Sequence, residues 1–401
     1  MKGLDVLKKL LLLSSLPIIL LAGELSDVLS ADKSKLLEYK REQNSEQSHQ
    51  LENSWINPIR IQYSKTYSSQ YPRTIGLDQF VISVDQPIFK MGGIWSAMKY
   101  AVALGKANAL EIEIQKQGMI TQAYTLLYNL KKAQLQEQKL GFMIQNDELE
   151  IGIQKESYDA GLSNRTLYDQ ALLKRNQDIT ANLETQMSMV KLQNEFSLLS
   201  DENTEAFELP HFTLIQQADY EVGQLELQRD RFRIEEKRYN YRMIWTKYLP
   251  ELSITGRYVD EDLNPMFVGG NLNRQYYTYG FRVSLPISIT AKNDINSNKI
   301  IYLESKINFD EQKKKVINSY KLVKKKLEII DKKIALSKED ATHYESMLIT
   351  TQELEAIGDK TNYDTQIIAN TLKVRELDQS IYAIDAQLEL LELYSKVSGA
   401  I

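Results

Sequence analysis

The chain has 401 residues, a formal net charge of −5 and no cysteine. Lysine and arginine (49) are mixed with aspartate and glutamate (54), and this lack of a basic excess argues against a nucleic-acid binder. Without cysteine, thiolate catalysis, cysteine–zinc sites and disulfides are excluded. Only 17 glycines and 8 prolines interrupt the chain, which is few for a compact protein of this length and favours long helices.

The N-terminus has the pattern of an export signal. Positive charge at Lys2, Lys8 and Lys9 precedes the apolar run "LLLLSSLPIILLA" at 10–22. This run is shorter than the about 20 residues that a membrane-spanning helix needs. We expect a signal peptide at 1–23, with a boundary as late as 31; a short buried helix is the alternative. Since no later segment reads as a transmembrane helix, any membrane insertion would have to use β-strands.

Four segments alternate between apolar and polar residues with period 2, namely 59–67, 79–85, 252–258 and 277–287. Each is close to the 9–11 residues that cross an outer membrane as a tilted strand. They form two hairpins, with a short loop near 68–76 and a longer one near 260–275. Tyrosines cluster toward the strand ends, as an interfacial aromatic girdle requires: Tyr63, Tyr67, Tyr258, Tyr277 and Tyr279. Ordinary amphipathic hairpins of a soluble sheet are the alternative, and the export signal favours the membrane.

Four strands are too few to close a barrel, and open strand edges are not tolerated in lipid. The smallest natural outer-membrane barrels have about eight strands. We therefore expect oligomerisation, in which three copies supply twelve strands.

The rest of the chain is predicted to be helical, at about 33–56, 92–158, 163–201, 216–247, 291–356 and 362–398. Apolar residues in the later helices recur at heptad spacing, as in seams where one helix packs on another. Gly161 and Gly358 each stand where a long helix stops, which suits the left-handed conformation after a helix C-terminus. Thr361 or Asn362 can then cap the following helix.

The same order of elements occurs twice. Pro87 and Pro286 are about 200 residues apart, as are Gly161 and Gly358, and such a period is the mark of an internal repeat. Prolines stand at the strand–helix junctions of both halves (Pro58, Pro87, Pro250 and Pro286). The predicted layout is a signal peptide (1–23), an N-terminal helix (24–57), barrel hairpin 1 (58–90), α-barrel hairpin 1 (91–205), a linker with an equatorial helix (206–249), barrel hairpin 2 (250–290) and α-barrel hairpin 2 (291–401).

No catalytic constellation is found. The three histidines His49, His211 and His343 are far apart and have no partner at ligand spacing. No phosphate-binding glycine loop, nucleophile elbow or cluster of metal-binding carboxylates is present. We predict that the protein is not an enzyme and uses no cofactor and no metal.

Six segments lie at the junctions and turns of the two halves and at the end of the last helix, namely "YLPELSITGRY", "VDQPIF", "VSLPIS", "YDAGLSNRTLYDQA", "IGDKTNYDTQ" and "YSKVSG". Together they resemble the TolC family of outer-membrane efflux proteins over roughly residues 33–399. The resemblance implies a mainly α fold with a small β part and a two-fold internal repeat. It also implies a homotrimer, with a 12-stranded outer-membrane β-barrel joined to a long periplasmic α-helical barrel. Its implied function is the exit duct of a tripartite efflux or type I secretion system, docked to a periplasmic adaptor and an inner-membrane pump.

The resemblance also implies a gate at the periplasmic tip, where acidic residues ring a narrow entrance. Asp364, the sixth residue after Gly358, matches one such position, and Lys360 stands where a basic residue ties the gate. Further gate candidates are Tyr363, Asp359, Arg165 and Asp169. Ile367 and Leu167 depart from the family pattern, so the gate is expected to be looser or closed by other contacts. The alternative for Asp364 is an exposed carboxylate favoured by the start of a helix.

Two other classes of function share some of these features. A periplasmic coiled-coil adaptor or scaffold shares the helical hairpins but does not need two lipid-length strand pairs with tyrosine belts. An exported enzyme would need a polar cluster that the sequence lacks. The cargo stays open as well, because channels of this family export drugs, metal ions and proteins.

Overall fold

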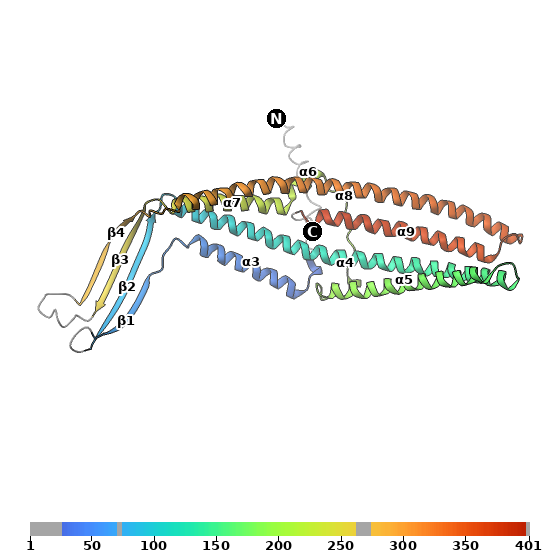
Figure 1. Ribbon diagram of the computed structural model, residues 1–401, viewed down its shortest axis with the longest axis horizontal. Coiled ribbons are helices and arrows are strands. Elements are labelled where there is room, and N and C mark those ends of the chain that lie inside the picture. Colours follow the sequence, from blue (N-terminus) through green and yellow to red (C-terminus); the bar gives the residue numbers. More distant parts are fainter. Residues whose placement is uncertain (1–25, 70–73, 262–273, 398–401) are drawn as a thin grey trace, which may run out of the picture. The chain divides into compact units, whose positions relative to one another are not determined.

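The computed structural model describes residues 26–69, 74–261 and 274–397 (Figure 1). The predicted signal peptide and most of the loop near 260–275 lie outside these residues. None of the helices described is both long and apolar enough to cross a membrane. As predicted, the chain is mainly helical with a small sheet. Within the described residues, its α-helices and β-strands are α3 (Ala31–Glu52), β1 (Arg60–Ser68), β2 (Ile75–Phe89), α4 (Gly93–Asp159), α5 (Arg165–Ser197), α6 (Gln217–Gly223), α7 (Leu225–Thr246), β3 (Glu251–Glu261), β4 (Gln275–Ser284), α8 (Ala291–Ala356) and α9 (Asn362–Tyr394).

The chain divides into two compact units. The first, here the sheet unit, comprises 39–112 and 226–313 and contains all four strands, most of α3, the start of α4, α7 and the start of α8. The second, here the hairpin unit, comprises the residues up to Glu38, 113–225 and those from Lys314 onward. It contains α5, α6, α9 and the remainders of α4 and α8.

In the sheet unit the strands form one antiparallel sheet in the order β1-β2-β3-β4. Because side chains alternate along a strand, the register decides which residues share a face. Tyr63 lies opposite Phe80, Ile82 opposite Tyr258, and Tyr258 in turn opposite Tyr277. Most of the apolar residues of the four strands therefore gather on one face, whereas Val81, Val259 and Tyr276 lie on the other.

This apolar face is largely exposed within the chain. The exposed fractions reach 69% at Ile61, 78% at Phe281 and 83% at Tyr279. Tyr277 and Tyr279 stack with ring centroids 6.2 Å apart. Exposed apolar patches of this kind mark surfaces that meet a partner or a membrane.

The prolines occupy different positions at the strand ends. Pro87 lies within β2, where the pairing with β3 shifts register between Pro87 and Phe89. A proline cannot donate a ladder hydrogen bond, and a bulge accommodates it. Pro58 and Pro250 precede β1 and β3, whereas Pro286 follows the end of β4 at Ser284. The strand over 79–85 is thus longer than expected and continues past its proline.

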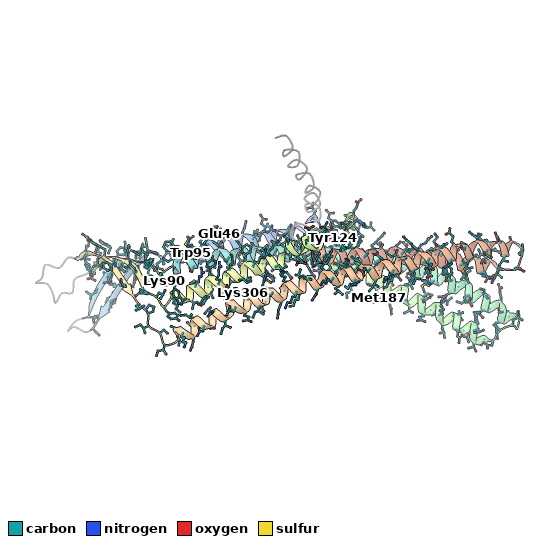
Figure 2. The ribbon with its side chains drawn as sticks, turned by 90° about the horizontal axis from the view of Figure 1, so that it is seen from above. Glu46, Lys90, Trp95, Tyr124, Met187 and Lys306 are labelled. Carbon is teal, nitrogen blue, oxygen red and sulfur yellow. The ribbon has the colours of Figure 1, made fainter. Side chains whose placement is uncertain are left out.

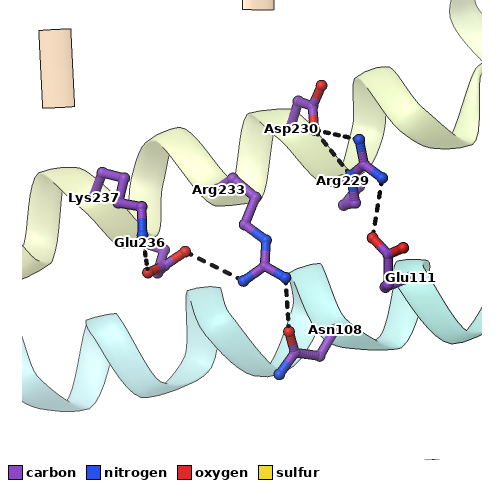
Figure 3. Close-up of polar contacts among 7 residues, drawn as sticks. All are labelled: Asn108, Glu111, Arg229, Asp230, Arg233, Glu236 and Lys237. Carbon is purple, nitrogen blue, oxygen red and sulfur yellow. Dashed lines mark hydrogen bonds and ion pairs between the residues drawn. The ribbon is translucent and has the colours of Figure 1, made fainter. Parts of the chain in front are cut away.

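Helices α4 and α7 of the sheet unit are joined by a polar network (Figure 3). Arg229 Nη1 lies 3.0 Å from Glu111 Oε2, and Arg233 Nη2 donates to Asn108 Oδ1 at 3.0 Å. The side chain of Glu236 is only 5% exposed and is paired with Arg233 (3.4 Å) and Lys237 (3.0 Å). A buried carboxylate needs such partners, since an unpaired one would be costly to desolvate.

In the hairpin unit an irregular segment at 207–216 is fastened to three helices. The Tyr128 hydroxyl donates to the Pro210 carbonyl, and the Tyr320 hydroxyl donates to the Ile215 carbonyl at 2.8 Å. The backbone N–H of Phe212 donates to Gln387 Oε1 at 2.7 Å. These bonds reach α4, α8 and α9, so the segment replaces secondary structure with tertiary hydrogen bonds.

The prediction of a single helix over 216–247 is wrong. It is divided into α6 and α7 at Gln224, whose backbone is not helical (φ −59°, ψ 113°). Gln224 forms an isolated antiparallel bridge with Val397, and the Leu225 N–H donates to the Lys396 carbonyl at 3.0 Å. A Cβ atom on Gly223 would lie 2.5 Å from Val397 Cγ1, so glycine permits this close approach.

Helices α4 and α9 are held together by polar pairs spaced seven residues apart on each helix. Two are ion pairs with N–O distances of 2.6 Å, and the third is an amide–hydroxyl bond of 3.2 Å. In antiparallel packing, a seven-residue step returns each pair to the same seam, so these contacts fix the register of α9 on α4. The pairs are Lys132–Asp385, Lys139–Asp378 and Asn146–Thr371.

Candidate gate at the two helical turns

The hairpin unit contains two turns, α4 to α5 and α8 to α9, which lie at the same end of the unit (Figure 1). Both contain a glycine with positive φ, +71° at Gly161 and +83° at Gly358. Their hydrogen bonds are equivalent. The Leu162 N–H donates to the Ser157 carbonyl at 2.8 Å, and the Asp359 N–H donates to the Leu354 carbonyl at 2.9 Å. Both are Schellman motifs, in which glycine supplies the left-handed residue.

The helices that follow the turns are capped by short polar side chains. Asn164 caps α5 and accepts from the Leu167 N–H. Thr361 caps α9 and accepts from the Asp364 N–H, while Asp364 Oδ2 accepts from the Thr361 N–H at 3.0 Å. This reciprocal pair is a capping box. Leu167 and Asp364 therefore hold the same position in the two repeats, and only the second carries a carboxylate.

Asp364 is engaged mainly with its own turn. Its carboxylate also accepts from the Thr361 hydroxyl at 2.9 Å and lies 3.8 Å from Lys360 Nζ. The Thr361 backbone N–H, with smaller help from the hydroxyl and from Lys360, lowers the pKa of Asp364. The group is therefore an anion at neutral pH, held in a fixed place.

The remaining predicted gate residues are distributed over the two turns. Arg165 Nε lies 3.5 Å from Asp169 Oδ2, and both side chains are exposed. Asp359 is exposed beside Gly358. Contacts within each turn thus bring together Arg165 with Asp169 and Lys360 with Asp364.

Tyr363, a predicted gate residue, links the two hairpins directly. Its partner, Glu156, was not predicted from the sequence. The Tyr363 hydroxyl donates to Glu156 Oε1 at 3.1 Å, joining the start of α9 to the end of α4. This hydrogen bond raises the pKa of Tyr363. Glu355 was missed as well. It accepts from Asn362 Nδ2 at 2.9 Å and from the Thr365 hydroxyl, which lowers its pKa.

The aromatic residues of the predicted girdle lie in the sheet unit, on the apolar face. Tyr63, Tyr67, Tyr277 and Tyr279 are between 65% and 83% exposed. Tyr258 is half-buried between Ile82 and Tyr277. Among the residues described, no cluster of three histidines or carboxylates is suited to a metal ion.

No protein-family model matches the sequence, and no curated protein matches it. Solved structures do match. The chain is similar to the outer membrane protein VceC of Vibrio cholerae, with a TM-score of 0.73 and 13% identity over 94% of this chain and 95% of that one. It is also similar to the CmeC outer membrane channel of Campylobacter jejuni, with a TM-score of 0.73 and 15% identity over 95% and 86%.

A third match is the open state of the MtrE outer membrane channel of Neisseria gonorrhoeae, with a TM-score of 0.63 and 12% identity over 94% and 88% of the two chains. The chain has the fold of the TolC-family outer-membrane channels. The fold class implied by the resemblance, mainly α with a small β part, is thereby confirmed. In a TolC-like fold, the two turns described above belong to the helical hairpins and the apolar face belongs to the sheet.

Proposed function

We propose that this protein is the outer-membrane exit duct of an efflux or secretion system, assembled as a homotrimer. The observation that carries the proposal is the four-stranded sheet with one exposed apolar face and two edge strands, β1 and β4. Unpaired edges are not stable in lipid. Joining β4 of one copy to β1 of the next removes every edge, and three copies give the twelve-stranded barrel of the TolC-like fold.

Two exposed apolar stripes on the helices support the same assembly. One lies on α5 at Leu183, Met187 (labelled in Figure 2) and Val190, which are 54%, 73% and 67% exposed. The other lies on α8 and repeats every seven residues, at Leu322, Ile329 and Leu336, each more than half exposed. Spacing of three, four and seven residues is that of helix-packing seams, so both stripes fit contacts with neighbouring copies.

The helical part would then enclose a periplasmic passage that ends at the two turns. In the trimer each turn occurs three times, and Asp364 places three carboxylates around one axis. Such a ring attracts cations and disfavours anions. The hydrogen bond from Tyr363 to Glu156 holds the start of α9 to the end of α4. This hydrogen bond has to break if α9 moves away from α4. An inner-membrane pump and a periplasmic adaptor are the partners that such a duct requires.

The gate assignment is tested by ion selectivity in planar bilayers. We expect Asp364→Asn to lower the cation-to-anion permeability ratio by roughly threefold or more, because the ring loses its charge. Asparagine keeps an oxygen for the Thr361 N–H, so the helix cap is retained. The matched control is Asp364→Glu, which keeps both the charge and the capping box and should conduct like the wild type. Equal selectivity of Asp364→Asn and the wild type would reject Asp364 as the gate ring.

A periplasmic coiled-coil scaffold is the second candidate, because the heptad seams of α8 and α9 serve such a protein as well. The apolar face of the sheet speaks against it, since a soluble scaffold would expose this face to water.

A further inference from the structure

The face of the sheet opposite Tyr63, Tyr258, Tyr277 and Tyr279 is mostly polar, apart from Val81, Val259 and Tyr276. It forms a hollow of about 540 Å³. Arginines gather there, at positions 60 on β1, 257 on β3 and 282 on β4. In a closed barrel with its apolar face toward lipid, this polar face lines the lumen. The following inference therefore rests on the proposed function.

The cations near the helix-proximal end of this face are neutralised. Arg282 Nη1 lies 2.6 Å from Asp85 Oδ2, and Lys90 Nζ lies 2.9 Å from Glu251 Oε2. These two pairs leave little net charge, because each carboxylate is already paired with a cation.

Arg60 and Arg257, unlike Arg282 and Lys90, are not neutralised. Both side chains are exposed, and within the described residues neither forms a salt bridge. The register places them in one row, with Ser83 between them, because Arg60 lies opposite Ser83 and Ser83 lies opposite Arg257. Each chain therefore contributes two unpaired guanidinium groups at one level of the sheet, and a trimer would contribute six.

The nearest acidic residue farther along this face does not neutralise the charges of Arg60 and Arg257. Glu261 is four residues beyond Arg257 on β3, which is about 13 Å along a strand. Its carboxylate already accepts from Gln79 Nε2 at 2.6 Å and from the Tyr276 hydroxyl at 3.1 Å. This distance exceeds the Debye length of about 8 Å at physiological salt, so the two levels act separately.

We propose that Arg60 and Arg257 form an anion-attracting ring inside the barrel, which concentrates molecules that carry carboxylate or phosphate groups there and opposes the cation preference of the Asp364 ring. Guanidinium groups match both kinds of anion through paired N–H donors. The wall of a twelve-stranded barrel lies roughly 12 Å from the axis, and the side chains point inward from it. At 0.1 M salt, with a Debye length of about 10 Å, the field reaches the passing ion; at 1 M, with about 3 Å, it does not.

The test compares reversal potentials in a KCl gradient for the wild type and for the double variant Arg60→Gln/Arg257→Gln. We expect the anion-to-cation permeability ratio to fall by roughly threefold to tenfold at about 0.1 M salt, and to change little at 1 M. Added citrate, as a trivalent carboxylate probe, should reduce the wild-type current more than that of the variant, and inorganic phosphate tests the other class of anion.

Lys65→Gln is the matched control. It removes one cation from the opposite face of β1, where Lys65 lies 3.4 Å from Asp78, and should leave selectivity unchanged. A double variant that conducts with the selectivity of the wild type, or a Lys65→Gln shift of the same size, would overturn the ring. If the wild type forms no pore, the proposed function fails first, and that outcome is distinct from a conducting pore with unchanged selectivity.

Discussion

Replacing Leu393 with alanine is expected to lower the free energy of unfolding by about 3–5 kcal/mol. Leu393 is fully buried in the hairpin unit, near the end of α9 and three residues before Lys396, whose carbonyl accepts the Leu225 N–H. Truncation there leaves a cavity near the end of α9, four residues before Val397, which bridges Gln224. Chemical denaturation of the detergent-solubilised protein, followed by circular dichroism, measures the loss.

Leu162→Ala is the control for this prediction. Leu162 lies in the α4–α5 turn and is 84% exposed, so the same truncation should cost less than about 0.5 kcal/mol. Similar losses for the two variants would show that the region around the end of α9 is not the packed core that the structure describes.

Replacing Lys174 with methionine is expected to cost about 2–3 kcal/mol at pH 7. Lys174 on α5 is the cation that contacts Asp147 on α4, a side chain only 3% exposed, and it lies 3.7 Å from Asp178. Removing one partner of a buried pair leaves an uncompensated charge, at about 3–5 kcal/mol for full burial. Because the lysine itself is 61% exposed, we expect less than this range.

The pH dependence of this variant has a defined sign. Burial raises the pKa of Asp147, and Lys174 opposes that rise. Without the lysine the pKa rises further, so the folded state binds the proton more tightly than the unfolded state does, whose value is about 3.9. The loss of stability should therefore be largest at neutral pH and shrink as the pH falls toward about 4.

Two companion variants complete the measurement. Lys174→Met/Asp147→Asn should regain part of the lost stability at pH 7, since the second change removes the stranded charge. Lys191→Met removes a cation of the same helix that is 77% exposed and pairs with Glu195 at 3.8 Å, and it should cost no more than about 0.5 kcal/mol. A loss that does not depend on pH would contradict the role assigned to Asp147.

Local patterns predicted the parts of the fold that local chemistry determines. Alternation along β4 identified its two faces, because the side-chain period of a strand is fixed at two. Gly161 and Gly358 were found because a helix that ends in a left-handed residue needs glycine there. The sequence "TNYD" at 361–364 has the spacing of a capping box, so the pairing of Thr361 with Asp364 follows from local sequence, as does the cap predicted at Thr361.

Other features depend on residues that are distant in sequence. The break at Gln224 is set by its bridge to Val397, which no local pattern reveals, and α6 and α7 therefore read as one helix. The bond between Glu156 and Tyr363 joins residues 207 positions apart. Likewise, Arg60 and Arg257 share a row only because β1 and β3 both pair with β2.

In the proposed assembly, three copies of the sheet close into one barrel. The most direct test of this closure is the mass of the native protein, extracted with mild detergent from the outer-membrane fraction and measured by light scattering with correction for bound detergent. We predict a trimer that is found in that fraction and requires detergent for release. A monomer or dimer released without detergent would leave β1 and β4 unpaired and contradict the duct, and a periplasmic coiled-coil scaffold would then explain the long helices better.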